Sequence, residues 1–279
     1  MLFLLKDKEV EPDAEDRYFK LIEKRATRVP LQYITGVQEF MGFKFKVSPD
    51  VLIPRQDTEV LVTEAAKTIR LWQEQQLQQL QKGSILKKFK GVPLFDVLDL
   101  CCGSGAIGLS LNGICEGITV TATDISEEAL KLAVENSRNL RIGADFVQGD
   151  MFDALVNGYQ YAESGPKNKK KGAKVKRFDM IVSNPPYIKT STIPMLQEEV
   201  KSHEPMLALD GGRDGLEFYR RIVAQASDWL KSGGYLMMEI GYDQGEDLRK
   251  LIRDNGNYTP AEIIKDLPGK DRVVKCQKR

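Results

Sequence analysis

The sequence predicts a doubly wound, Rossmann-like α/β fold built on a seven-stranded sheet. Short apolar runs rich in β-branched residues alternate with segments of helical periodicity, a pattern typical of parallel strands joined by crossover helices. A glycine-rich turn, Gly103-x-Gly105-x-x-Gly108, follows the first core run at residues 94–100. Two final runs, 259–264 and 272–276, can pair as an antiparallel hairpin that closes the sheet.

Composition indicates a globular protein from a reducing compartment. The 279 residues carry 41 basic and 40 acidic side chains, and a net charge of +1 argues against nucleic-acid binding over the whole surface. Four cysteines show no CxxC spacing and His203 is the single histidine, so no metal site is predicted. The apolar start stops at Lys6, too early for a signal peptide or a membrane span. We expect a cytoplasmic protein without a membrane partner.

The chain is expected to begin with small elements ahead of its main domain. Residues 1–29 contain one amphipathic helix, at 11–29, and residues 30–50 form a small β-hairpin linker from the runs 31–34 and 43–47. The main domain spans 51–279. At its start Pro54 stops an apolar stretch before a helix, where we expect Arg55, Thr58 and Glu59 to provide capping and first-turn charge. Residues 71–90 read as an exposed extension of this helix and a linker.

Each core element of the main domain has its own signal in the sequence. Ser126 is expected to cap a helix with Glu127 and Glu128 in its first turn. Another helix starts at Leu216. Beyond the run at 94–100, the predicted strands are 118–123, 145–150, 178–183 and 234–240, and a last helix covers 244–254.

Residues 157–177 interrupt this pattern. They combine glycines and a proline with a dense run of lysines, and no apolar periodicity survives. We therefore expect a basic, flexible surface insertion. It could contact RNA or an acidic partner, but a solvated charge run is the favoured interpretation.

The glycine turn admits two interpretations. Alone, the GxGxxG spacing suggests a dinucleotide and hence an oxidoreductase. However, the preceding strand ends in Asp99, whose carboxylate would repel a pyrophosphate and suits the cationic amino-acid end of S-adenosylmethionine. Asp124 ends the next strand, where a carboxylate meets ribose hydroxyls. Met151, at the end of the third strand, could flank an adenine ring. The sequence thus favours a methyltransferase.

Asn184-Pro185-Pro186-Tyr187 follows the apolar run at 178–183 and is the candidate reaction site. Ligands bind at strand ends of open α/β sheets. Prolines cannot donate backbone hydrogen bonds, so this segment leaves the sheet as a stiff wall with free carbonyls. The Asn184 side-chain oxygen and the Pro185 carbonyl could together hold both hydrogens of an NH2 group. The alternative is an ordinary turn.

From Pro30 onward the chain resembles the protein-(glutamine-N5) methyltransferases that modify peptide chain release factors, the HemK or PrmC family. The motifs that carry the resemblance are 30–36 (PLQYITG), 52–59 (LIPRQDTE), 99–108 (DLCCGSGAIG), 184–187 (NPPY) and 203–205 (HEP). It implies a class I S-adenosylmethionine-dependent methyltransferase sheet in the main domain. It also implies that Cys101, Cys102, Gly103, Ser104, Gly105 and Asp124 bind the cofactor, with Met151 beside it and Asn184 contacting cofactor and substrate.

Three features depart from the family pattern. Cys101 stands where such turns commonly have glycine. The family's amino-terminal helical domain, implicated in docking the release factor, is represented only by the remnant at 1–29. The lysine-rich insertion is not part of the pattern.

The resemblance implies methyl transfer to the side-chain amide of the glutamine in the Gly-Gly-Gln motif of release factors. Asn184, Pro185 and Tyr187 are the expected catalytic residues, and Pro186 joins them in binding the substrate. Alternatives are an N6-adenine or guanine-N2 nucleic-acid methyltransferase with Tyr187 stacked on a flipped base, and a ribosomal-protein glutamine methyltransferase. A non-catalytic cofactor-binding protein is a further class. No recognition domain or broad basic face is evident, so no stable nucleic-acid partner is expected.

Overall fold

The computed structural model describes all residues except 1–10, 83–91, 163–164 and 169–175. Within the described residues, nine strands form one sheet in the order β10-β11-β9-β8-β3-β4-β5-β6-β7. Their bounds are β3 Phe95–Leu100, β4 Ile118–Asp124, β5 Asp145–Gln148, β6 Tyr159–Ala162, β7 Gly165–Asn168, β8 Phe178–Ser183, β9 Leu230–Glu239, β10 Glu262–Lys265 and β11 Asp271–Gln277.

The seven strands from β10 to β5 correspond to the predicted sheet. Strand β3 pairs in parallel with β4 and β8, while β5 joins β4 and β9 joins β8 in parallel. Strand β11 is antiparallel to both β9 and β10, which confirms the predicted closing hairpin. The order of the parallel strands reverses at β3, and this is where an open α/β sheet forms its ligand crevice.

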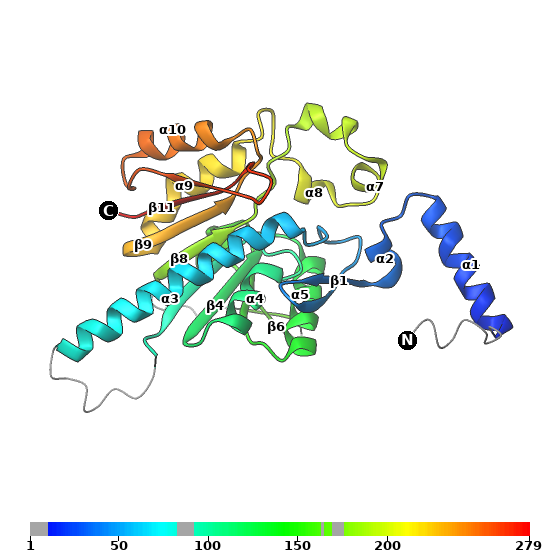
Figure 1. Ribbon diagram of the computed structural model, residues 1–279, viewed down its shortest axis with the longest axis horizontal. Coiled ribbons are helices and arrows are strands. Elements are labelled where there is room, and N and C mark those ends of the chain that lie inside the picture. Colours follow the sequence, from blue (N-terminus) through cyan, green and yellow to red (C-terminus); the bar gives the residue numbers. More distant parts are fainter. Residues whose placement is uncertain (1–10, 83–91, 163–164, 169–175) are drawn as a thin grey trace.

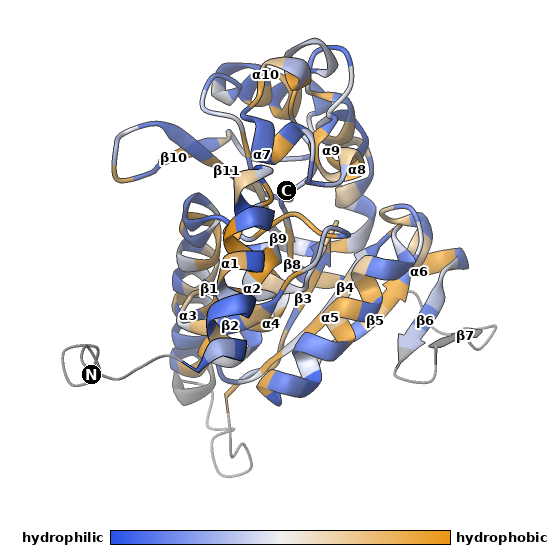
Figure 2. Ribbon diagram, turned by 90° about the vertical axis from the view of Figure 1, so that its right-hand side faces the viewer, coloured by the Kyte–Doolittle hydropathy of each residue, from blue (hydrophilic) through white to orange (hydrophobic). Residues whose placement is uncertain are grey.

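Helices cover both faces of the sheet (Figure 1). Helices α3 (Glu59–Lys82), α4 (Ala106–Ile114) and α5 (Glu127–Leu140) pack on one face, and α9 (Glu217–Trp229) and α10 (Gly245–Asn255) on the other. Successive strand residues supply the two cores alternately: Val97 packs with the first and Leu98 with the second. Hydrophobic segments accordingly gather where helices meet strands (Figure 2).

One predicted strand is a helix. Residues 31–34 were expected to form half of the linker hairpin, but Leu31–Thr35 is the short helix α2. Pro30 is its N-cap and Gly36 ends it in the left-handed region at φ 75°. The hairpin is formed instead by β1 (Val37–Phe40) and β2 (Phe43–Lys46), so the prediction was wrong about its first strand only.

Helix α1 (Pro12–Ala26) lies apart from the sheet (Figure 1) and has no buried residue. Arg25, near its end, contacts the distant Glu199 at 2.6 Å.

The other short elements are η2 (Gln56–Thr58), α6 (Asp153–Asn157), η3 (Thr190–Met195), α7 (Glu198–Lys201) and α8 (Met206–Leu209). Across the described ranges, no helix combines the length and the apolar character needed to span a membrane.

Residues 157–177 were expected to form a basic, flexible surface insertion without regular periodicity, but the first part of this segment belongs to the sheet. Strands β6 and β7 extend the sheet beyond β5 as an antiparallel pair (Figure 2). Tyr161 is buried there, because its side chain packs into the core that β6 shares with α5. Most of the lysine-rich run, 169–175, lies outside the described residues.

Candidate active site

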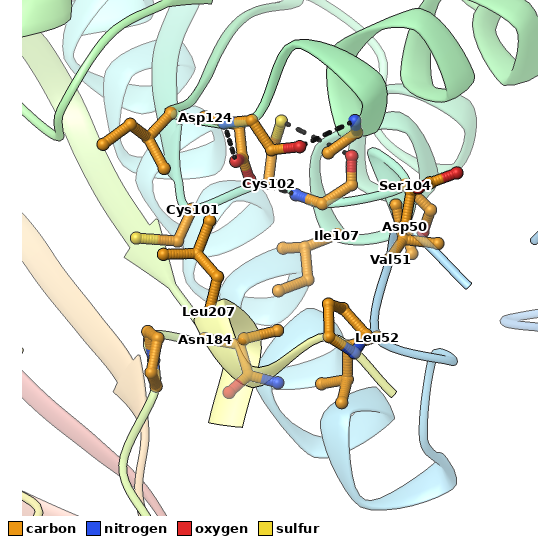
Figure 3. A pocket seen from close by; sticks show the side chains of 18 of the residues that line it. Asp50, Val51, Leu52, Cys101, Cys102, Ser104, Ile107, Asp124, Asn184 and Leu207 are labelled. Carbon is orange, nitrogen blue, oxygen red and sulfur yellow. Dashed lines mark hydrogen bonds between the residues drawn. The ribbon is translucent and has the colours of Figure 1, made fainter. Parts of the chain in front are cut away.

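A pocket of about 380 Å³ opens at the carboxyl ends of the parallel strands (Figure 3). The sequence-predicted residues that line it are Cys101, Cys102, Gly103, Ser104, Asp124, Met151, Asn184 and Pro186. Gly105, Pro185 and Tyr187 do not line it. The strands β3, β4 and β8 thus bring most of the predicted residues to one place.

The turn after β3 follows a left-handed path. Cys101 has φ 59°, which confirms that a residue with a Cβ occupies a position favourable to glycine. A Cβ on Gly103 would meet no atom within 4 Å, so the space above this residue is open. By contrast, a Cβ on Gly105 would lie 3.1 Å from Leu109 Cδ1 and 3.3 Å from Ala133 Cβ. Gly105 therefore allows close helix packing and does not form pocket surface.

Asp124 ends β4 at the pocket and fixes the turn. Its Oδ2 accepts a hydrogen bond from Gly103 N at 2.8 Å, and its Oδ1 accepts one from Ser126 N at 2.9 Å. Burial raises the pKa of Asp124, while these N–H groups favour the charged form. Since each carboxylate oxygen can accept a further hydrogen bond, Asp124 can also receive ligand hydroxyls.

Asp99 has a different role from the expected one. Its side chain is fully buried, it does not line the pocket, and its Oδ2 accepts a hydrogen bond from Gly108 N at 2.9 Å. Burial raises its pKa to about 7. The prediction that Asp99 faces the cationic end of the cofactor is therefore wrong, because the side chain turns under α4 and anchors this helix to β3.

The tetrapeptide begins where β8 ends, as predicted. Asn184 Nδ2 donates a hydrogen bond to Thr58 Oγ1 at 3.4 Å. No described residue donates to Asn184 Oδ1, so this oxygen can accept hydrogen bonds from a ligand. Pro185 is buried beside it and Pro186 reaches the pocket.

Tyr187, one of the expected catalytic residues, does not line the pocket. Its hydroxyl donates to Glu239 Oε1 at 3.2 Å, and its carbonyl accepts from Gln244 Nε2 at 3.1 Å. Burial, reinforced by the Glu239 charge, raises the pKa of Tyr187. The tyrosine thus ties the tetrapeptide to the end of β9.

Residues that follow the third predicted strand, β5, also line the pocket. Met151 is buried at the pocket with φ 50°, next to Asp150, whose Oδ2 lies 2.6 Å from Arg221 of α9. An apolar side chain at this strand end lies where the sequence predicted one, and it offers a flat ring a non-polar surface.

Several pocket residues were not predicted. Thr58 is only 4% exposed and touches Asn184, although it was expected merely to cap a helix. Apolar walls come from residues 49–54 and 205–208, including Leu52 and Leu207. The motifs at 52–59 and 203–205 were the signals that could have located both walls.

An ion pair joins these two walls. Arg55 binds Glu204, whose side chain is 1% exposed. Burial raises the pKa of Glu204 and Arg55 opposes this effect. The neighbouring His203 contacts Thr27 O at 3.3 Å. Nowhere in the described part of the chain do three or more potential metal-binding side chains gather.

The sequence is similar to known methyltransferases over nearly its whole length. Residues 93–277 match the family described as "Methyltransferase domain", and residues 1–36 match "PrmC N-terminal domain". A release factor glutamine methyltransferase of Moorella thermoacetica is 39% identical over 275 residues, covering 98% of this chain and 83% of that protein. The corresponding Clostridium botulinum protein is 34% identical and covers 99% and 86%, respectively.

Solved structures agree on the fold. A methyltransferase from Pyrococcus furiosus superposes with a TM-score of 0.52 at 19% identity, covering 92% of this chain and 98% of that one. A human methyltransferase 10 domain containing protein gives 0.51 at 16% identity and covers 92% and 96%. The chain is thus a methyltransferase with S-adenosylmethionine as its cofactor, and it belongs to the release factor glutamine methyltransferase family.

Proposed function

We propose that this protein methylates the side-chain amide nitrogen of the glutamine in the Gly-Gly-Gln motif of a peptide chain release factor. The observation that carries the proposal is the pair of acceptors at the end of β8. Asn184 lines the pocket and its Oδ1 receives no hydrogen bond from the described residues. The carbonyl of Pro185, which does not itself line the pocket, follows directly in the chain. The names of the relatives support release factors as the substrate class.

The pocket residues fit S-adenosylmethionine. The open surface above Gly103 accommodates a ligand against the backbone, and Asp124 has acceptor capacity for the two ribose hydroxyls. Met151 and the exposed Ile125 offer apolar surface to adenine. When bound, the cofactor supplies a methyl group made electrophilic by the positive sulfur.

The protein activates the amide by orienting it. An amide nitrogen is a poor nucleophile because its lone pair is delocalised into the carbonyl. When Asn184 Oδ1 and the Pro185 carbonyl accept the two hydrogens, the nitrogen is fixed and its lone pair can be aimed at the methyl carbon. Positioning of this kind contributes at most about 7 to 11 kcal/mol of barrier lowering. The methylated nitrogen is strongly acidic, so its proton passes to an acceptor already in contact and on to water.

The placement of Tyr187 favours an amide over a nucleobase. A base-modifying enzyme would use this ring to stack the flipped base. Here the hydroxyl is engaged with Glu239 and the ring does not line the pocket. Together with the balanced charge of +1, this supports a protein substrate without a stable nucleic-acid partner.

We also propose that the reaction takes place in the cytoplasm, where translation occurs, and that residues 1–29 help to dock the release factor. The exposed apolar side chains of α1 support such a role. They are Tyr18, Phe19, Leu21 and Ile22.

Labelled S-adenosylmethionine, offered with purified release factors, a ribosomal protein and RNA side by side, tests the function. We expect mass spectrometry to find one added methyl group on the Gly-Gly-Gln glutamine, and none when that glutamine is changed to Glu. Asn184→Ala should lower turnover by about 100-fold or more, whereas Asn184→Asp retains an acceptor and some activity. Label found only on RNA or only on the ribosomal protein would refute the proposal.

A further inference from the structure

A buried carboxylate lies behind the tetrapeptide. Glu239, at the end of β9, is 1% exposed and does not line the pocket. Its Oε1 accepts the hydrogen bond from the Tyr187 hydroxyl, while its backbone carbonyl accepts one from the Tyr219 hydroxyl at 2.9 Å. Glu239 therefore cannot touch the substrate but contacts the element that does.

Thr58 connects this carboxylate to Asn184. The threonine oxygen accepts the hydrogen bond from Asn184 Nδ2. The Thr58 side chain also lies near enough to Glu239 to favour the ionised form of its carboxyl group. Glu239 Oε2 is nevertheless buried without a partner at normal hydrogen-bonding geometry among the described residues. The hydroxyl hydrogen of Thr58 thus has an anionic acceptor available on the side away from Asn184.

The direction of these hydrogen bonds follows from the chemistry of a carboxylate. An ionised carboxylate can only accept, so it attracts the single hydrogen of Thr58. The threonine oxygen then acts as an acceptor toward Asn184, which must turn its NH2 group to Thr58 and leave Oδ1 for the substrate. A neutral group at position 239 removes this constraint, because Thr58 can then donate to Asn184 Oδ1.

We propose that Glu239 is a positioning residue that fixes, through Thr58, which end of the Asn184 amide faces the substrate. Through Tyr187 it also holds the other end of the tetrapeptide. The proposal rests on the function assigned above to Asn184. Thr58, on η2, and Glu239, on β9, would thus act together to orient Asn184, although they are far apart in the sequence.

The charges around Glu239 make this arrangement sensitive to pH. Burial raises the pKa of Glu239 to about 7, whereas Thr58, Arg272 of β11 and Tyr187 favour its ionised form and Asp57 of η2 opposes it. Arg272 is itself held by Asp57 at 2.9 Å and by Asp266 at 3.1 Å. Ionisation near neutral pH should therefore set the orientation of Asn184.

Kinetics of four variants test the proposal. We expect Glu239→Gln and Thr58→Val to lower kcat by about 10- to 100-fold, with KM for the release factor and the Kd for S-adenosylhomocysteine within about threefold of wild type. Thr58→Ser, which restores the hydroxyl, should recover most of kcat. Glu262→Gln is the matched control, because it neutralises an exposed carboxylate on β10 and should change nothing.

The pH profile separates positioning from a purely structural role. The wild-type kcat should rise as pH increases through about 7, and this limb should be absent in Glu239→Gln. A Glu239→Gln enzyme with the wild-type kcat and profile would overturn the proposal. So would a Thr58→Ser variant that folds but is as slow as Thr58→Val.

A measurement that needs no catalysis distinguishes failure of this positioning role from failure of the proposed function. The side-chain NH2 signal of Asn184 in the nitrogen-15 NMR spectrum is identified by its loss in Asn184→Ala. It should shift with an apparent pKa near 7 in the wild type and not in Glu239→Gln. If the wild type methylates no release factor but shows this titration, only the proposed function fails. A signal that behaves identically in both proteins refutes the positioning role.

Discussion

At the scale of single residues, two aspartates at the ends of neighbouring strands have different roles. Asp99 and Asp124 both have pKa values raised mainly by burial. Asp99 lies under α4 and receives one backbone N–H, whereas Asp124 reaches the pocket and organises the glycine turn. One carboxylate therefore supports the scaffold and the other is available to the cofactor.

Replacing Asp124 with Asn should weaken cofactor binding. The amide keeps one acceptor but loses the charge that strengthens hydrogen bonds to ribose hydroxyls and to Gly103 N. We expect a loss of roughly 1.5 to 3 kcal/mol in calorimetric titrations with S-adenosylhomocysteine. Unchanged affinity, or tight binding of NADH in place of this ligand, would contradict the assignment of the pocket.

The buried acids should make stability depend on pH. Asp99 titrates at 3.8 when unperturbed and at about 7 in the folded protein. At pH values between these two, the unfolded chain has lost a proton that the folded chain keeps, so the free energy of unfolding falls as pH rises. Glu239, raised from 4.5 to about 7, acts in the same direction.

Asp99→Asn isolates this contribution, because the amide oxygen can still accept from Gly108 N. Urea unfolding at several pH values should show a shallower decline between about pH 4 and 7 than in the wild type. Parallel pH curves for the two proteins would mean that Asp99 does not titrate in this range.

Sequence reasoning located the residues whose role depends on the local chain. Ser126 caps α5 as predicted, with Oγ accepting from Ala129 N at 3.2 Å, and Cys101 adopts the left-handed conformation that its place in the turn requires. Thr58 and Glu239 could not be recognised this way. Their role arises only when η2, β8 and β9 come together, and no local pattern specifies such contacts.

At the scale of elements, the strands at the edge of the sheet are too short for hydrophobic periodicity to predict them. The buried strand β8 was predicted over its full length from a continuous apolar run. Strand β6 has only the alternation of Tyr159 and Tyr161, within a segment dominated by glycine and lysine. Pairing with β5 stabilises β6 as a strand, and the composition of the segment alone did not predict this pairing.

Tyr161 should be the residue that attaches this edge to the core. It is 6% exposed and belongs to the core shared by α4 and α5, so Tyr161→Ala should cost about 3 kcal/mol of unfolding free energy. Tyr161→Phe loses only the 3.4 Å contact with Glu127 and should cost less than about 1 kcal/mol. These values are measured by urea unfolding.

Tyr159 provides the matched control, since it lies on the same strand but is 51% exposed. Tyr159→Ala should change stability by no more than about 0.5 kcal/mol. Equal losses for the two alanine variants would show that the strand, and not the buried ring, carries the stabilisation.

At the scale of the whole molecule, the pocket is closed by segments far apart in the sequence. Residues from 49–54 and from 205–208 both line the pocket, and the ion pair Arg55–Glu204 joins these two segments. Glu204 Oε2 has no hydrogen-bond partner among the described residues, so Arg55 is the principal compensation for this buried charge. The two walls should therefore respond to mutation as a unit.

A double-mutant cycle tests this coupling. Arg55→Met leaves Glu204 buried without its cation and should destabilise the protein by about 2 kcal/mol at pH 8, less than for a fully buried pair because Arg55 is 40% exposed. Glu204→Met should also destabilise. The double variant should recover much of the loss, because neither charge remains and both side chains stay large enough to fill their places. Urea unfolding of the four proteins gives the coupling energy, and additive losses would show that the walls are held by apolar packing instead.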